Sequence, residues 1–234
     1  MSHVTEALGV NTRGIERRRT LLGGRTTGML LRDLTMLLGG LFVFAVGQLL
    51  SLQCNLGASS WTVLHDGISR HTPLSIGEAT QGVGLLMVLV SWLAGVRPGL
   101  GTVANMLLVG FFLDLLLWLD IVPRVEPYPL RVLLLLGSIA TIGLASALYI
   151  KAGFGAGPRD SFMLAMTRRS GWRVGRVRWL MEVTAVALGI LLGGRFGVGT
   201  LIFAMLVGFA VDASFRLFRL RSGDHAAHSK PVVA

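Results

Sequence analysis

Long uncharged blocks alternate with short polar connections along most of the 234 residues. No charged residue occurs in residues 36–52, 83–96, 100–113 or 132–150. A helix that crosses a bilayer needs about 20 largely apolar residues, because the hydrocarbon is about 30 Å thick and each residue rises about 1.5 Å. A helix on the surface of a soluble protein carries a polar face instead. The pattern therefore predicts an all-α integral membrane protein.

The blocks predict helices of two lengths. Six segments are long enough to span a bilayer, whereas two segments of about 12 residues would reach only about 18 Å. We expect these two short helices to be re-entrant or interfacial, because they follow glycine-rich turns and cannot cross the hydrocarbon. The long helices are expected at residues 30–52, 76–95, 100–119, 128–150, 174–193 and 198–217, and the short ones at 59–70 and 158–169.

The chain contains the same unit twice. A single offset of 98 residues aligns residues 33–114 with residues 131–212 without a gap, and 20 of the 82 paired positions are identical. The identities concentrate on glycines and charges, so that RPGLGT at 97–102 recurs as RFGVGT at 195–200. Such self-similarity at a fixed offset indicates a tandem duplication. We divide the chain into a basic tail (1–29), two membrane repeats (30–121 and 122–217) and a polar tail (218–234).

The number of spans in each repeat decides how the repeats are oriented. Three spans per repeat give an inverted repeat, as in many secondary transporters, whereas a crossing short helix would give a 4+4 parallel repeat. The matched connections differ in charge, because residues 70–80 contain one arginine and residues 168–178 contain five. Cytoplasmic connections carry an excess of Lys and Arg. We therefore favour the 3+3 inverted repeat, with both termini in the cytoplasm.

The charge of the chain fits a membrane protein. Basic residues outnumber acidic ones by 22 to 12, and they gather at the chain ends and in the connections. This distribution argues against nucleic-acid binding, and it predicts that the arginine-rich connection 168–178 contacts anionic lipid headgroups. The basic start of the chain precedes an apolar block of full length without a small-x-small cleavage site, so we expect a retained first helix in the inner (plasma) membrane rather than a signal peptide.

Patterns typical of enzymes are missing from the sequence. It contains no H-E-x-x-H motif, no Ser-His-Asp cluster and a single cysteine, Cys54. We therefore expect no enzymatic activity, no metal and no cofactor.

The residues GPRD at 157–160 form the sharpest candidate binding motif. Pro158 suits the first turn of a helix, and the exposed N–H groups of such a turn can hold an anion. Arg159 would add a positive charge, while Asp160 would cap the helix and offset that charge. A ligand site at Gly157–Asp160 is thus weighed against a well-capped structural helix.

Other polar residues lie within the apolar segments. Glu182 has Gly84 as its counterpart in the first repeat, so it is a candidate solute or proton contact, or else the buried partner of an arginine. The first short helix offers Trp61, His65 and Asp66 as binding residues at the outer mouth, with a solvated surface as the alternative.

Two further residue types recur in both repeats. Asp114 and Asp212 lie near the far ends of their helices, 12 residues after Thr102 and Thr200. An isolated charge inside a bilayer costs about 2.5–3.5 kcal/mol on insertion scales, so it normally has a polar partner. We consider these four residues as coupling or gating groups, with a shared scaffold role as the alternative.

Several of these motifs resemble those of the YczE/YitT-type bacterial membrane proteins. The resemblance covers about residues 30–217 and rests on a glycine-rich turn, a GP-x-D start of the short helix, G-x-G-T opening a span and an aspartate closing it. The first repeat departs from the pattern at Ser59, Ser60 and Thr62, which replace Gly, Pro and Asp. The resemblance implies a multi-spanning plasma-membrane protein and brings no reaction or substrate with it.

The sequence supports two functional hypotheses. We expect transport or permeation of a small solute through a site at the repeat interface. The alternative is a non-transporting membrane protein that regulates another component through its arginine-rich cytoplasmic face. A second copy of the chain is a further candidate partner.

Overall fold

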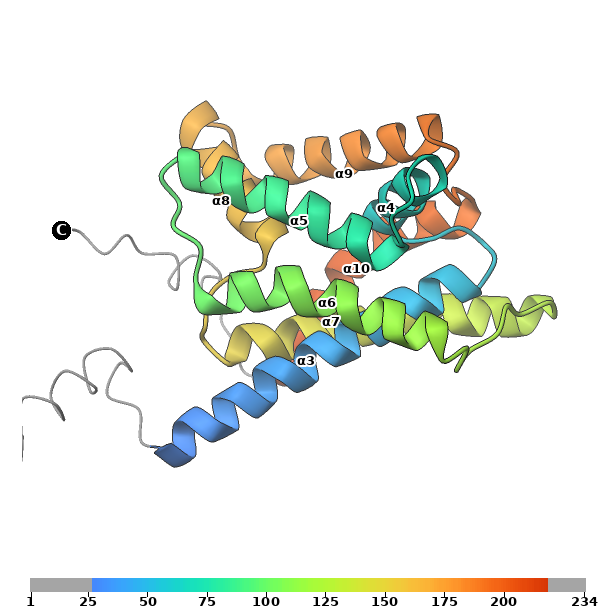
Figure 1. Ribbon diagram of the computed structural model, residues 1–234, viewed down its shortest axis with the longest axis horizontal. Helices are drawn as coiled ribbons and strands as arrows, with labels where there is room; N and C mark the ends of the chain where they lie inside the picture. The colour runs from blue at the N-terminus through green and yellow to red at the C-terminus, as the bar shows by residue number, and fades with distance from the viewer. Residues whose placement is uncertain (1–26, 219–234) are drawn as a thin grey trace, which may run out of the picture. The chain divides into compact units, whose positions relative to one another are not determined.

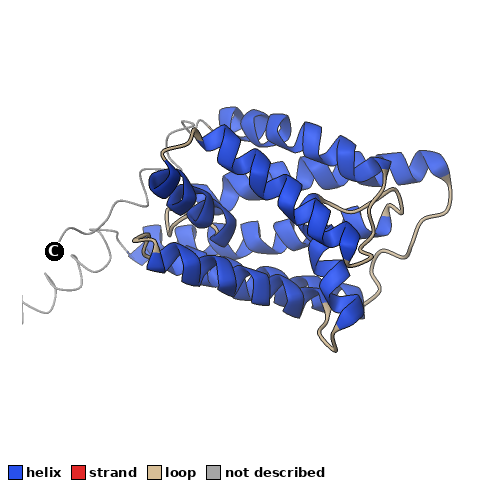
Figure 2. Ribbon diagram, turned by 90° about the horizontal axis from the view of Figure 1, so that it is seen from above, coloured by secondary structure: helices blue, strands red, loops and turns tan. Residues whose placement is uncertain are grey.

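The computed structural model describes residues 27–218, and their regular structure is entirely α-helical (Figure 2). Each helix begins and ends within three residues of its predicted position. Most of the two predicted tails lies outside the described residues. The described helices are α3 (Thr27–Gln53), α4 (Ser60–His71), α5 (Ile76–Leu93), α6 (Leu100–Trp118), α7 (Tyr128–Lys151), α8 (Pro158–Ser170), α9 (Val174–Leu191) and α10 (Val198–Leu217).

The chain divides into two compact units, residues 1–35 and residues 36–234. The described part of the first unit is the start of α3, where the Arg32 guanidinium donates to the Asp33 carboxylate at 3.1 Å. The Thr35 hydroxyl donates to the Leu31 carbonyl in the same helix. The rest of α3 and the other seven described helices belong to the second unit, which contains the core and the candidate site.

Five of the described helices are long and apolar enough to cross a membrane, namely α3, α5, α6, α7 and α10. Helix α9 has 18 residues but carries three charges, Arg176, Arg178 and Glu182, and is not among the five. Helices α4 and α8, of 12 and 13 residues, are too short to span the hydrocarbon. The chain is therefore a helical membrane protein with five helices of spanning length and composition, where the sequence predicted six.

Local sequence explains where two of these helices begin and end. Helix α5 begins with a capping box, in which the Ser75 hydroxyl accepts from the Glu78 N–H and the Glu78 carboxylate accepts from the Ser75 N–H. Helix α8 begins with Pro158 and ends at Ser170, and it is capped by Gly171, whose φ of 68° is left-handed. The turn and helix signals of the sequence thus act at the predicted positions.

Helix packing joins the two repeats through their short helices (Figure 1). Within the repeats, α5 packs against α6 and α7 packs against α10. Between them, α4 of the first repeat packs against α9, and α8 of the second repeat packs against α5. Each short helix therefore lies against a long helix of the other repeat.

A hydrogen-bonded junction fixes the turn of the second repeat to the start of α6. The Gly101 N–H donates to the Phe154 carbonyl at 2.8 Å, and the Thr102 hydroxyl donates to the Ala156 carbonyl at 2.6 Å. A Cβ at Gly99 would lie 2.6 Å from the Phe154 carbonyl oxygen. The turn can approach this closely only because glycine is present.

The matching junction fixes the turn of the first repeat to the start of α10. The Gly199 N–H donates to the Leu56 carbonyl at 2.7 Å. Gly57 has a φ of +115°, and a Cβ there would lie 2.6 Å from the Gly197 nitrogen and from the Thr200 hydroxyl oxygen. Leu56 and Phe154 are 98 residues apart, as are Gly101 and Gly199. The recurring G-x-G-T motif is thus the docking site for the turn of the other repeat.

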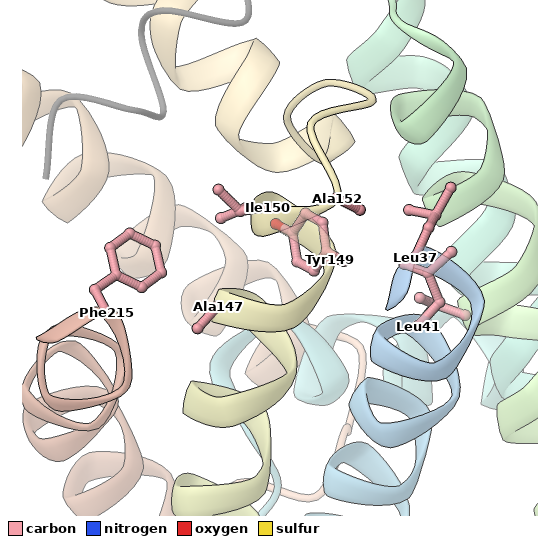
Figure 3. Close-up of a cluster of buried hydrophobic side chains, with 8 residues drawn as sticks. Leu37, Leu41, Ala147, Tyr149, Ile150, Ala152 and Phe215 are labelled. Carbon is pink, nitrogen blue, oxygen red and sulfur yellow. The ribbon is translucent and has the colours of Figure 1, made fainter. Parts of the chain in front are cut away.

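A hydrophobic cluster joins α3, α7 and α10 (Figure 3). Leu37 and Leu41 of α3 lie beside the Tyr149 ring at the end of α7, and Phe215 of α10 belongs to the same cluster. Helices α3 and α7 approach closely, because a Cβ at Gly40 would lie 2.8 Å from the Tyr149 nitrogen. Small residues at such contacts are the usual means of close helix packing in membranes.

The junctions predict a strong effect of Gly57→Ala. Alanine is strained at this φ and its Cβ would contact the start of α10, so the free energy of unfolding should fall by at least about 2 kcal/mol. Denaturation of the purified protein in mixed detergent micelles, followed by circular dichroism, measures this change.

Gly39→Ala is the matched control, because Gly39 lies inside α3 and a Cβ there would have nothing within 4 Å. Its stability should stay unchanged or rise by up to about 1 kcal/mol. Equal stability of the two variants would contradict the described junction.

Candidate functional site

A cavity of about 110 Å³ lies between the two repeats. All eight described helices, or the residues directly before them, contribute to its lining. A cavity needs roughly 10–15 Å³ to hold one water molecule. The cavity therefore has room for several waters or for a small solute.

Trp61 and Arg159 meet at this cavity. The Arg159 guanidinium carbon lies 4.7 Å from the centroid of the Trp61 ring, and the Trp61 indole N–H donates to the Glu182 carboxylate at 2.9 Å. The indole thus holds a positive charge on its face and a negative charge at its edge. Trp61 and Arg159 occupy equivalent positions of the two repeats, 98 residues apart. The two repeats therefore contact each other at the site through a matched pair of residues.

The start of α8 contributes the predicted GPRD motif to the lining. Gly157 is the N-cap, and a Cβ there would lie 3.2 Å from the Tyr149 hydroxyl oxygen. That hydroxyl donates to the Asp160 carboxylate at 3.1 Å. Asp160 in the first turn offsets the positive end of the helix, while the Arg159 side chain lies over Trp61.

The start of α4 also lines the cavity, and it carries no acidic residue in its first turn. The Ser59 and Thr62 hydroxyls bond to each other at 2.7 Å, and His65 Nδ1 shares a hydrogen bond with the Thr80 hydroxyl at 2.9 Å. The Ser60 hydroxyl and the Gln48 side-chain oxygen are buried without a partner among the described residues. Buried polar atoms are normally hydrogen-bonded, so these two need a partner from water or from a ligand.

Four charged side chains line the cavity, two of each sign: Arg159, Arg178, Asp160 and Glu182. Among the described residues, no basic nitrogen lies within 4.0 Å of the Glu182 carboxylate. Its hydrogen-bond partner in this part of the chain is the Trp61 indole. The site is therefore charged, formally balanced and only partly paired.

Asp66 is not among the cavity-lining residues. Its carboxylate accepts from the Arg70 guanidinium at 3.1 Å and from the Arg195 backbone N–H at 2.8 Å, and it forms an ion pair with the Arg195 side chain at 3.3 Å. Burial lowers the pKa of the Arg195 guanidinium, and the negative charge of Asp66 opposes that change. Asp66 thus ties α4 to the connection between α9 and α10.

The structure brings seven of the eight predicted binding residues to the cavity: Trp61, His65, Gly157, Pro158, Arg159, Asp160 and Glu182. It also brings residues there that the sequence did not single out as ligands, including Tyr149, Thr80 and Arg178. Tyr149 stands near the end of an apolar segment, and only its packing against α8 reveals its contact with Asp160.

Of the residues predicted for coupling or gating, the threonines lie in equivalent places in the two repeats and the aspartates do not. Thr102 and Thr200 lie in the two junctions. Asp114 accepts from the Gly77 N–H at 2.8 Å and from the Ser75 hydroxyl, so it ties α6 to the start of α5. Asp212 is exposed, and its side chain makes no hydrogen bond or ion pair with another described residue.

The contacts around these aspartates differ in the same way. Gly77 and Gly110 are in close backbone contact, so a Cβ on either would collide with the other helix. Gly175, the counterpart of Gly77, has open space where a Cβ would be. Helices α5 and α6 pack closely, whereas α9 packs against α4 and α8, and α10 packs against α7. Equivalent helix pairs thus adopt a closed form in the first repeat and a separated form in the second.

Residues 27–218 contain no group of three or more His, Cys, Asp or Glu side chains that could hold a metal ion.

Comparison with known proteins relates the chain to bacterial membrane proteins. Residues 31–216 match a family of unknown function, DUF6198. The chain is 34% identical over 182 residues to the uncharacterized membrane protein YczE of Bacillus subtilis. The aligned residues make up 77% of this chain and 84% of that relative. An uncharacterized protein of Haemophilus influenzae is 32% identical over 181 residues (77% and 82%). The uncharacterized protein YyaS of Bacillus subtilis is 26% identical over 173 residues (72% and 85%). No solved structure matches the chain.

The asymmetry of the two aspartates predicts unequal effects of the same substitution. Asp114→Asn removes the charge that accepts two hydrogen bonds at the start of α5, so the free energy of unfolding should fall by about 1.5–3 kcal/mol. Asp212→Asn is the matched control and should change stability by less than about 0.5 kcal/mol. Chemical denaturation in detergent micelles compares the two variants, and equal losses would contradict the described difference between the repeats.

Proposed function

The chain belongs to this YczE-type family of membrane proteins, and we propose that it carries a small solute across the membrane through the cavity between its repeats. The proposal includes a 3+3 inverted repeat in the inner (plasma) membrane, with α9 as the sixth span and both termini in the cytoplasm. The site binds and moves its solute without changing it chemically. The observation that carries the proposal is the cavity at the repeat interface, which four charged side chains line and where the first turns of both short helices meet.

The directions of equivalent helices support an inverted repeat. Helices α5 and α9 run in opposite directions in Figure 1, and so do α6 and α10. The reciprocal junctions, at residues 99–102 and 197–200, lie at opposite ends of the helices in the same view. In transporters built this way, broken or short helices form the solute site near the middle of the membrane.

The charges of α9 are compatible with a span that faces a polar interior. Glu182 bonds to Trp61 at the cavity, and Arg178 also lines the cavity. Charged residues inside membranes normally face a bundle interior or a water-filled cavity. The three charges that set α9 apart from the five apolar helices thus accord with a role in the site.

The difference between the repeats supports alternation between two states. Asp114 closes α5 onto α6, whereas the equivalent Asp212 is exposed. If the repeats exchanged these conformations, α9 would close onto α10 and α5 would separate from α6. A solute that binds both states would then cross as the populations interconvert. Arg178 is exposed and lines the cavity, so the described state is open near the start of α9, which we assign to the cytoplasmic side.

A second candidate function rests on residues 168–178, which run from the end of α8 to the start of α9. Five arginines are exposed there: Arg168, Arg169, Arg173, Arg176 and Arg178. Each basic residue near an anionic leaflet contributes about 1 kcal/mol of attraction. We propose that this face rests on anionic lipid headgroups, and a regulatory protein without transport activity would use the same face to bind its membrane partner.

Access to the cavity from both sides of the membrane tests transport against regulation. Asn105 of α6 lines the cavity, so Asn105→Cys in a Cys54→Ala background places one thiol there. A carrier predicts modification by a membrane-impermeant maleimide both in intact cells and in inverted vesicles. Modification from one side alone, in either orientation, would contradict the carrier.

Met205→Cys is the control for this measurement. Met205 of α10 is 72% exposed on an apolar surface and is not a cavity-lining residue. Its thiol should react from neither side, because a charged maleimide does not enter the hydrocarbon.

A further inference from the structure

We infer that the solute is a small zwitterion, whose anionic group binds Arg159 and the first turn of α4 and whose cationic group binds near Glu182 and Gln48. This inference rests on the proposed carrier function and names the chemical class of its substrate. It follows from unpaired hydrogen-bonding groups of both kinds in one cavity.

Arg159 provides the donors. Its guanidinium lies over the Trp61 ring, and within residues 27–218 it makes no hydrogen bond and has no carboxylate within 4.0 Å. A guanidinium carries five N–H donors in a planar fork that matches a carboxylate or another planar oxyanion. A stack on an indole leaves those edge donors unpaired, so the site is built for an anionic group in front of them.

The first turn of α4 provides a second anion contact. The N–H groups at a helix start attract negative charge, and α4, unlike α8, has no acidic residue in its first turn. Ser60 opens α4, is 1% exposed and has a side-chain oxygen without a partner. A hydroxyl that is buried at the cavity wall and unpartnered indicates a ligand atom beside it.

The acceptors lie in the same lining. The Gln48 side chain is 2% exposed, and its oxygen has no partner among the described residues. The Glu182 carboxylate accepts one hydrogen bond from the described residues, from Trp61, although two oxygens can accept about four. An ammonium group, with three donors, would satisfy these acceptors.

Unpaired donors and unpaired acceptors in the same lining favour a zwitterion over a simple anion or a simple cation. A simple anion would pair Arg159 but leave the acceptors at Glu182 and Gln48 unsatisfied, and a simple cation would do the reverse. Trp61 contacts both Arg159 and Glu182, so the two charges are within reach of one molecule a few atoms long. The four charged side chains of the lining cancel formally, which suits a solute without net charge. The volume of about 110 Å³ limits that solute to a few heavy atoms.

Thermal unfolding of the purified full-length protein in detergent tests the inference with three sets of matched probes. Glycine and β-alanine are zwitterions, acetate and propionate keep only the anionic group, and methylamine and ethylamine keep only the cationic group. We expect a saturable rise in the unfolding temperature with at least one zwitterion, at a concentration at least tenfold lower than for either of its analogues. A simple anion or amine that binds as tightly, or no saturable shift with either zwitterion, would overturn the inference.

Substitution of the two charged residues expected to bind the zwitterion tests the inference a second way. Arg159→Gln and Glu182→Gln should each weaken binding of the preferred zwitterion at least tenfold, whereas Arg169→Gln, at an exposed arginine outside the cavity lining, should leave binding unchanged. Binding that survives both cavity substitutions would also overturn the inference. Circular dichroism and size-exclusion chromatography check folding, and the probe comparison on the unmodified protein stands if a variant does not fold.

The outcomes separate this inference from the carrier function. Zwitterion binding together with cavity access from one side would leave the inference standing and refute transport. Access from both sides without preference for a zwitterion would leave transport standing and refute the substrate class.

Discussion

The reciprocal junctions between the repeats are the constraint on which the site depends. Each glycine-rich turn presents a backbone carbonyl to the N–H group at the start of a long helix in the other repeat, at 2.8 Å for Gly101 and 2.7 Å for Gly199. Inside a membrane such polar groups have no water to bond, so each must find a partner within the protein. These hydrogen bonds pair a carbonyl of each turn with an N–H group at the start of a long helix, and they fix where each short helix begins.

Because the short helices begin at these turns, the first residues of both helices lie together at the cavity. Trp61 and Arg159 follow the two turns at equivalent positions and stack on each other. The duplication thus produces one site from two copies of a segment, and divergence between the copies gives that site its chemistry. Glu182 faces the cavity where the first repeat has Gly84, and Tyr149 holds Asp160 where the first repeat has Ser51 and Thr62.

The sequence predicted the helices and seven of the cavity-lining residues from local signals. Apolar length gave the long helices, and proline and glycine gave the start of α8. The sequence did not reveal which side chains bond to each other, since these pairings depend on contacts between distant segments. Asp66 was expected near the binding site, yet it ties α4 to Arg195, a residue 129 positions away. The unequal roles of Asp114 and Asp212 were also hidden, because identical residues in a repeat predict identical surroundings.

If the two repeats are inverted, two equivalent positions must lie on opposite sides of the membrane, and labelling of one such pair tests this. Thr72 directly follows α4, Ser170 is the last residue of α8, the two positions are 98 residues apart, and both are exposed. Each is replaced by cysteine in a Cys54→Ala background, and intact cells are treated with a membrane-impermeant maleimide. An inverted repeat predicts that residue 72 is labelled in intact cells and that residue 170 is labelled only after permeabilisation. Labelling of both positions from the same side would contradict it.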